Sequence, residues 1–171
     1  MVSISARAIT PSTQYKPKSF IKDMQRRATN VRNQIKRDFE ATTNEWKTPV
    51  KFDISKRRDG DSYIFSASTD NEIYGYVNNG TEPHIIRAKN APFLVFRTGG
   101  TAKTSVGQLK SGKGSRGIDW VSKKEVRHPG TEARKFDEII AKRFKDRWVK
   151  ESTDALREFM QTSTRPAGRN R

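Results

Sequence analysis

The chain has 171 residues, of which 35 are Lys or Arg and 19 are Asp or Glu, so its formal net charge is +16. It contains no cysteine, which excludes disulfide frameworks and Cys-ligated zinc, and no apolar run long enough to cross a membrane. Val, Ile, Leu and Phe make up only about a fifth of the residues, close to the level at which composition suggests disorder. We therefore expect one domain that relies on partners for stability and meets polyanions, either nucleic acid or acidic protein surfaces.

The first segment, residues 1–17, carries basic residues, no acidic residue and no apolar period. We expect an N-terminal extension that is flexible or docks on a partner.

Over 19–46, apolar residues recur every three or four positions, which predicts one face of an amphipathic helix. Ser19 is the expected N-cap, and Pro49 lies beyond the expected end. The apolar face consists of Phe20, Met24, Ala28, Val31, Ile35 and Phe39.

The period changes to two after this helix. Val50, Phe52 and Ile54 alternate with polar residues, and the Asp59-Gly60 pair that follows is typical of a hairpin turn. Short β-like runs come later in the chain and predict further antiparallel strands. These strands are expected at 63–67, 73–77, 85–86, 93–96 and 119–127.

The segment 98–118 is a long loop rich in glycine and lysine, between two expected strands. It holds six of the eleven glycines and no acidic residue. Loops of this length in a compact domain are usually functional or disordered, so we expect the loop to be disordered in the free subunit and ordered by a partner. Its cations are the candidate contacts with an acidic protein surface or with DNA: Lys103, Lys110, Lys113 and Arg116.

A second helix is expected over 132–162, because Phe136, Ile140, Phe144 and Trp148 recur every four residues. Thr131 is its expected N-cap, and 163–171 form a basic tail. The predicted fold is therefore a single α+β domain over 18–162, with an antiparallel sheet from 49–96 and 119–127 packed against two long helices. The side chains expected in the core are Phe20, Val31, Ile35, Phe39, Phe52, Phe65, Phe136, Ile140 and Phe144.

No catalytic, cofactor or metal site is expected from the sequence. His84 and His128 are the only histidines, and neither has a neighbouring nucleophile or carboxylate in a known catalytic pattern. Residues 107–115 approach the phosphate-loop pattern, but Gly114 stands where that pattern requires Ser or Thr. Nonspecific contact of the basic segments with nucleic acid remains an alternative function.

Two segments, 73–96 and 121–131, carry more specific motifs. The first contains Gly-Thr followed by Pro-His and an Ile-rich strand, and the second ends in His-Pro-Gly-Thr before a helix. In this order they resemble the tail-completion or neck proteins, which join head and tail in tailed double-stranded DNA phages. The matching residues are Gly80, Thr81, Pro83, His84, His128, Pro129, Gly130 and Thr131. These types favour a structural role, because glycine permits positive φ and proline stiffens turns.

The resemblance implies a virion structural protein, assembled in the host cytoplasm, that completes the tail and joins it to the head. It implies a homo-oligomeric ring, a hexamer or dodecamer, without catalysis. Neighbouring connector or stopper proteins and the tail terminator or tail tube are the implied partners, with double-stranded DNA in the lumen as a further contact. A tail-terminator or minor tail subunit of the same fold is the closest variant, and a nonspecific nucleic-acid-binding protein is the alternative from another class.

Overall fold

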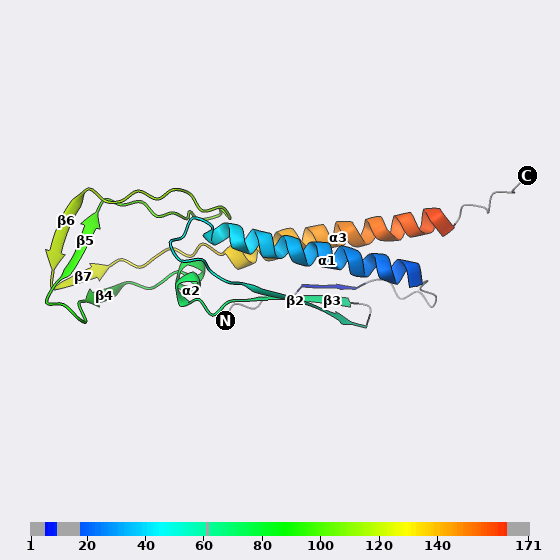
Figure 1. The fold of residues 1–171 in the computed structure, drawn as a ribbon, viewed down its shortest axis with the longest axis horizontal. Coiled ribbons are helices and arrows are strands. Elements are labelled where there is room, and N and C mark those ends of the chain that lie inside the picture. The colour runs from blue at the N-terminus through cyan, green and yellow to red at the C-terminus, as the bar shows by residue number, and fades with distance from the viewer. Residues whose placement is uncertain (1–5, 10–17, 61, 164–171) are drawn as a thin grey trace, which may run out of the picture.

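The computed structural model of the chain describes residues 6–9, 18–60 and 62–163. These residues form three helices and seven strands, which confirms the mixed α+β class. Figure 1 shows an elongated molecule with two long helices along its axis and small strands beyond one end of them. In chain order the elements are β1 (Ala6–Ile9), α1 (Lys18–Thr43), β2 (Asp53–Asp59), β3 (Ser62–Ser68), α2 (Glu72–Asn79), β4 (His84–Arg87), β5 (Leu94–Thr98), β6 (Asp119–Lys123), β7 (Glu125–His128) and α3 (Phe136–Ser163).

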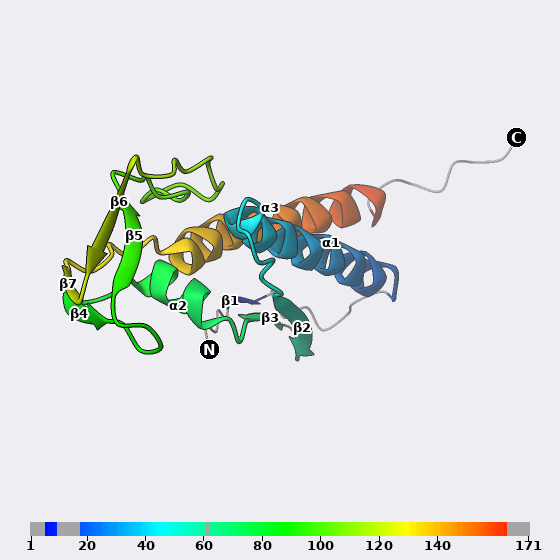
Figure 2. The same cartoon turned by 60° about the vertical axis from the view of Figure 1, so that its left-hand side comes forward.

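Helices α1 and α3 lie side by side and run in opposite directions (Figures 1 and 2). Their apolar residues follow the helical period predicted from the sequence and meet in the core. Phe20 is the exception among the expected core residues, because it is only partly buried and packs against Phe159 with ring centroids 5.3 Å apart. The expected core residues that are buried are Val31, Ile35, Phe39, Phe52, Phe65, Phe136, Ile140 and Phe144.

The largest sheet has the strand order β1-β3-β2 and is antiparallel throughout. The hairpin predicted around Asp59-Gly60 is confirmed, since β2 and β3 pair on either side of it. The sheet contacts both long helices: β2 meets α1, and β1 meets α3. An aromatic cluster joins β3 to α3. The ring centroids of Phe65 and Phe144 are 4.7 Å apart, and those of Tyr63 and Trp148 are 5.2 Å apart. Edge-on aromatic pairs of this kind add about 1 kcal/mol each to the free energy gained by burial.

Arg27 forms the polar link between the long helices. Its side chain is 11% exposed and donates to Asp23 on α1 at 2.7 Å, and to Glu151 and Glu158 on α3 at 3.1 and 2.7 Å. The hydrogen bond to Asp23 is the main cause of the raised pKa of Arg27. Partial burial alone would raise the pKa of Asp23, but the hydrogen bonds from Arg27 and Arg26 outweigh it and lower that pKa.

Residues 72–79 form the short helix α2, so the strand predicted at 73–77 is wrong. The Asn71 side chain caps the helix by accepting a hydrogen bond from the Tyr74 amide at 2.8 Å. Tyr74 and Asn78, four residues apart, are both fully buried. Isoleucine and tyrosine favour strands in isolation, but the cap and the four-residue spacing of the buried side chains favour a helix.

The end of α2 determines where α3 begins. The side-chain oxygen of Asn78 accepts a hydrogen bond from the Asp137 amide at 3.2 Å, and its backbone carbonyl accepts one from the Lys135 amide at 3.0 Å. These contacts satisfy amides near the start of α3, which would otherwise lack partners. The helix consequently begins at Phe136, and the expected N-cap Thr131 lies outside it.

The prediction of one sheet from 49–96 and 119–127 is also wrong. The described strands form three separate sheets, because β4 pairs with β7 and β5 with β6 beyond the ends of the helices that would cover them. Within the expected N-terminal extension 1–17, residues 6–9 pair with β3 as a strand of the main sheet. The rest of that extension, 1–5 and 10–17, lies outside the described residues, as does the basic tail from 164 onward.

The Arg27 link predicts how stability depends on pH. Because the pKa of Asp23 is lower in the folded protein than in the unfolded chain, its contribution is present above the unfolded value and disappears as pH falls through the folded value. We expect Arg27→Met to lower the free energy of unfolding by about 2 kcal/mol at pH 7, and to reduce the fall in stability between pH 5 and pH 3. Urea denaturation at a series of pH values measures both effects.

Arg37→Met is the matched control. Arg37 lies on the same helix, is exposed and has no ion pair with another described residue. Its replacement is expected to change stability by less than about 0.5 kcal/mol. Equal losses for the two variants would contradict a special role for Arg27.

Candidate functional site

Residues 80–131, which we call the arm, contain the motif residues, the glycine-rich loop and two small sheets. We call the two long helices and the β1-β3-β2 sheet the body. The chain leaves the body after α2 and returns to it just before α3. In between, β4 pairs with β7 and β5 pairs with β6, each as a separate antiparallel pair. Figure 2 shows these strands beyond the ends of the long helices. The arm carries ten basic and three acidic residues, a net charge of +7.

The two halves of the sequence motif meet at the base of the arm. The Thr81 amide donates to the Thr131 carbonyl at 2.9 Å, and the Thr131 amide donates to the Thr81 carbonyl at 3.0 Å. The preceding residues, Gly80 and Gly130, have φ values of +75° and +89°. A Cβ on Gly80 would lie 2.5 Å from the Thr131 oxygen, and one on Gly130 would lie 2.3 Å from the Thr81 oxygen. Both positions therefore require glycine, and we call this reciprocal contact the clamp.

The two histidines of the motif lie next to the clamp. His84 and His128 are direct partners across β4 and β7, and their rings stack with centroids 5.0 Å apart. Nδ1 of His84 donates to the Glu82 carbonyl at 2.8 Å, whereas Nδ1 of His128 accepts from the Gly130 amide at 3.1 Å. Each ring is therefore tied to the backbone of its own turn. Pro83 and Pro129 flank these histidines and are exposed.

The arm exposes most of the large apolar side chains on the described surface. It carries seven of the eleven that are exposed, although it holds only about a third of the described residues. Val95 and Trp120 are 63% and 66% exposed and lie on the same face of the β5–β6 pair, where Arg97 stacks over the Trp120 ring at 4.9 Å. The exposed apolar residues of the arm are Ile85, Ile86, Phe93, Val95, Val106, Ile118 and Trp120.

The glycine-rich loop packs against the C-terminal end of α1. Leu109 is 7% exposed, and the Ser111 amide and hydroxyl donate to the carbonyls of Ala41 and Thr42. Lys103 donates to the Glu45 carbonyl. The loop thus satisfies carbonyls at a helix end that have no partner within the helix. This docking within the chain differs from the disorder expected for the free subunit.

The four loop cations do not converge on one point. Lys103 is held at the end of α1, while Lys110, Lys113 and Arg116 are exposed and make no ion pair with a described residue. The sequence identified these cations as candidate contacts, but it did not reveal Leu109 as the anchor of the loop. A single leucine within a polar, glycine-rich segment is the signal that could have indicated it.

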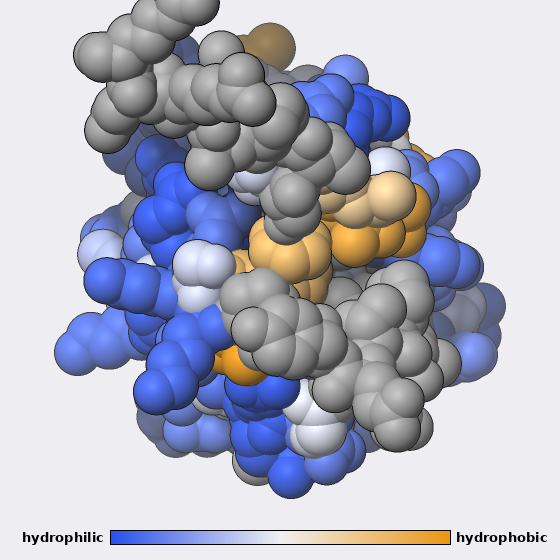
Figure 3. Space-filling view, turned by 90° about the vertical axis from the view of Figure 1, so that its right-hand side faces the viewer, coloured by the Kyte–Doolittle hydropathy of each residue, from blue (hydrophilic) through white to orange (hydrophobic). Residues whose placement is uncertain are grey.

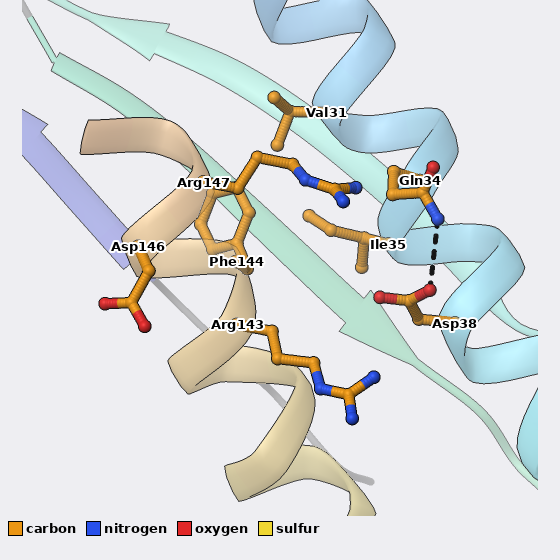
Figure 4. Close-up of a pocket in the computed structure, with 8 residues that line it drawn as sticks. All are labelled: Val31, Gln34, Ile35, Asp38, Arg143, Phe144, Asp146 and Arg147. Atoms are coloured by element: carbon orange, nitrogen blue, oxygen red, sulfur yellow. Dashed lines mark hydrogen bonds between the residues drawn. The ribbon is translucent and has the colours of Figure 1, made fainter. Parts of the chain in front are cut away.

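A shallow groove of about 340 Å³ separates the outer edges of α1 and α3 (Figure 4). Val31, Ile35 and Phe144 form its apolar floor. Arg143 and Arg147 extend from α3 towards α1, where the Gln34 amide donates to Asp38 at 3.1 Å. The described lining includes the carboxylates of Asp38 and Asp146, but no histidine, cysteine, serine or tyrosine.

Within 6–9, 18–60 and 62–163, no cluster of three or more His, Cys, Asp or Glu residues could hold a metal ion. Among the same residues, none of the helices combines the length and apolar character needed to span a bilayer.

The clamp predicts a large cost for adding a methyl group at either of its glycines. We expect Gly80→Ala and Gly130→Ala to lower the free energy of unfolding by at least about 3 kcal/mol, because positive φ and steric overlap with backbone oxygens act together. Gly107→Ala is the control: its φ is +76°, but nothing lies within 4 Å of the added Cβ. It should cost only about 1–2 kcal/mol. Urea denaturation followed by tryptophan fluorescence distinguishes the two cases, and similar losses at all three positions would disprove the clamp.

The docked loop predicts a pattern of proteolysis. Trypsin cleaves after Lys and Arg, and the loop offers Lys103, Lys110, Lys113 and Arg116. Leu109→Asp should release the loop and increase the rate of cleavage in it at least tenfold, because an unpaired charge cannot occupy the buried leucine site. Val106→Asp, at a position 46% exposed in the same loop, should leave the rate within twofold. Rapid cleavage of the wild-type loop would show that it is not docked.

Comparison with known proteins gives no assignment. No protein-family model, curated protein or solved structure matches the chain.

Proposed function

We propose that the protein is a virion structural protein of a tailed double-stranded DNA phage, which forms a homo-oligomeric ring in the neck. In this role it completes the tail and joins it to the head, without a catalytic step. The observation that carries the proposal is the exposure of apolar side chains on the arm, which a partner would bury. The base of the arm consists of the motif residues. A tail-terminator or minor tail subunit is the nearest variant of this function.

The arm is incomplete as an isolated structure. Two-stranded sheets are at best marginally stable in water, and stability normally requires a third strand or a packed face. Among the described residues, both the β4–β7 and the β5–β6 pairs have unpaired edges, and such edges readily add strands from other chains. A neighbouring subunit that covers Val95 and Trp120 would complete the β5–β6 pair and bury apolar surface.

A ring follows if the arm of one copy contacts the body of the next. Such a contact joins two different surfaces, and its repetition closes into a ring when the rotation between copies fits. Arm and body are both basic, so the contact between copies would depend on apolar burial rather than on ion pairs. In this arrangement the two long helices packed on the β1-β3-β2 sheet form the body of each subunit.

The loop cations are proposed to meet a different partner. Lys110, Lys113 and Arg116 are exposed and would contact an acidic surface of an adjacent ring, either the connector or stopper on one side or the tail terminator or tube on the other. Cyclic symmetry would repeat this charge around the lumen and strengthen its field. Double-stranded DNA in the lumen is the second candidate for the same contact.

The test is the mass of the protein in solution. The wild type should give a particle of six or twelve subunits, each of 19.6 kDa, in native mass spectrometry or light scattering in DNA-free buffer. The double variant Val95→Asp/Trp120→Asp should run as a monomer with an unchanged helical circular-dichroism spectrum, because both side chains are exposed and the charges oppose only their burial by a partner.

Val149→Asp is the matched control, since Val149 is 54% exposed on α3, away from the arm. It should retain the particle mass of the wild type. A monomeric wild type at high protein concentration would contradict the ring and favour the nonspecific nucleic-acid-binding alternative. Loss of the ring in the control variant alone would show that the interface lies on α3 and not on the arm.

A further inference from the structure

A strongly basic hollow lies where the N-terminal half of α1 crosses β2 and β3. Its volume is about 440 Å³, and among the seven described residues that line it, four are Lys or Arg and none is acidic. The end of the molecule at which α1 begins is largely hydrophilic on its described surface (Figure 3). The hollow is separate from the arm, its clamp and the loop cations. Its cations are Lys22, Arg26, Lys56 and Arg58.

Lys56 is held in the hollow and has no acidic partner among the described residues. Its ammonium group donates to the Gln25 carbonyl at 3.1 Å and to the Thr29 hydroxyl, so it bridges β2 and α1. Burial lowers the pKa of Lys56, and the charge of Arg32 lowers it further. No described carboxylate forms an ion pair with Lys56, so its positive charge is not neutralised within the described structure.

The nearest carboxylate on α1 is already engaged. Asp23 pairs with Arg26 and with Arg27. Among the described residues, this leaves Lys22, Lys56 and Arg58 of the hollow without an ion pair. A hollow with excess positive charge on fixed elements is a site for an external anion.

The spacing of the cations favours a chain of anionic groups over a single anion. Lys22 and Arg26 are one helical turn apart, about 6 Å along α1. Lys56 and Arg58 are two residues apart on the same face of β2, about 7 Å. Two rows of cations therefore face each other across an open hollow, whereas a single phosphate would need donors that converge on one point.

From this arrangement we infer that the hollow binds the phosphodiester backbone of double-stranded DNA, without reading its sequence. Backbone contacts of this kind release counterions, so binding weakens with salt in proportion to the number of phosphates contacted. The net charge of +16 would attract such a polyanion over a distance. The inference stands apart from the proposed ring, because the residues of the hollow are not those of the arm.

Two variants that lose equal charge test the inference. The hollow variant replaces Lys22, Arg26, Lys56 and Arg58 with Gln, and the loop variant replaces Lys103, Lys110, Lys113 and Arg116 with Gln. Each lowers the net charge from +16 to +12. Binding of a fluorescent 30-base-pair duplex is measured by anisotropy over a range of salt concentrations. The hollow variant should bind at least tenfold more weakly at 0.1 M salt, with a log–log salt slope smaller by about 3.

The loop variant should lose less than threefold in affinity. Equal losses in the two variants would show that net charge alone drives binding, and a larger loss in the loop variant would assign DNA to the loop; either result overturns the inference. A triple variant that keeps Lys56 guards against misfolding, since it preserves the bridge between β2 and α1. It should still lose most of the affinity of the wild type.

Two further measurements identify the ligand and separate this inference from the proposed function. Inorganic phosphate at 5 mM, with ionic strength held constant, should leave duplex binding unchanged, and its displacement of the duplex would indicate a single-anion site and overturn the inference. Light scattering in DNA-free buffer should give the same mass for the hollow variant as for the wild type. Wild type that forms the ring but does not bind duplex would remove this inference and leave the proposed function intact.

Discussion

The meeting of α2 with the start of α3 is the contact on which the rest of the structure depends. Asn78 is fully buried and accepts hydrogen bonds from the amides of Lys135 and Asp137 at the start of α3, and three residues later Thr81 pairs with Thr131. Residues that are some 50 positions apart in sequence are thereby fixed at one point. The body on one side of this point can pack α1, α3 and the main sheet, while the arm on the other side extends into solvent. Without it, the two ends of the arm would have no defined separation, and α3 would lack its start.

The scarcity of apolar residues explains how the chain divides its surface. The core consists of one seam between α1, α3 and the sheet, built largely from aromatic side chains such as Phe39, Phe65 and Trp148. The arm holds its proportionate share of the apolar residues, but lies beyond this seam, and seven of its large apolar side chains stay exposed. A protein of this composition gains stability by association, since burial of apolar area is the main favourable contribution that its isolated fold leaves unused.

The long helices and the first hairpin could be predicted from the sequence because their signals are local. A four-residue apolar period marks α1 and α3, and Asp59-Gly60 marks the turn. The sequence predicts a strand in place of α2 because Tyr74 and Tyr76 alternate within a β-like run, whereas the cap at Asn71 becomes evident only in the structure. The pairing of Gly80-Thr81 with Gly130-Thr131 was implied by neither motif alone, since a period or a turn signal carries no information about which distant segment will be its partner.

The clamp has a consequence for how the protein can vary. Because the chain enters and leaves the arm through two hydrogen-bonded threonines, the arm is an insertion whose ends already touch. The cost in loop-closure entropy then rises only slowly with the length inserted between them. The arm can therefore be replaced by a longer, shorter or differently charged segment between Thr81 and Thr131. The points at which the chain leaves and re-enters the helical body would stay the same.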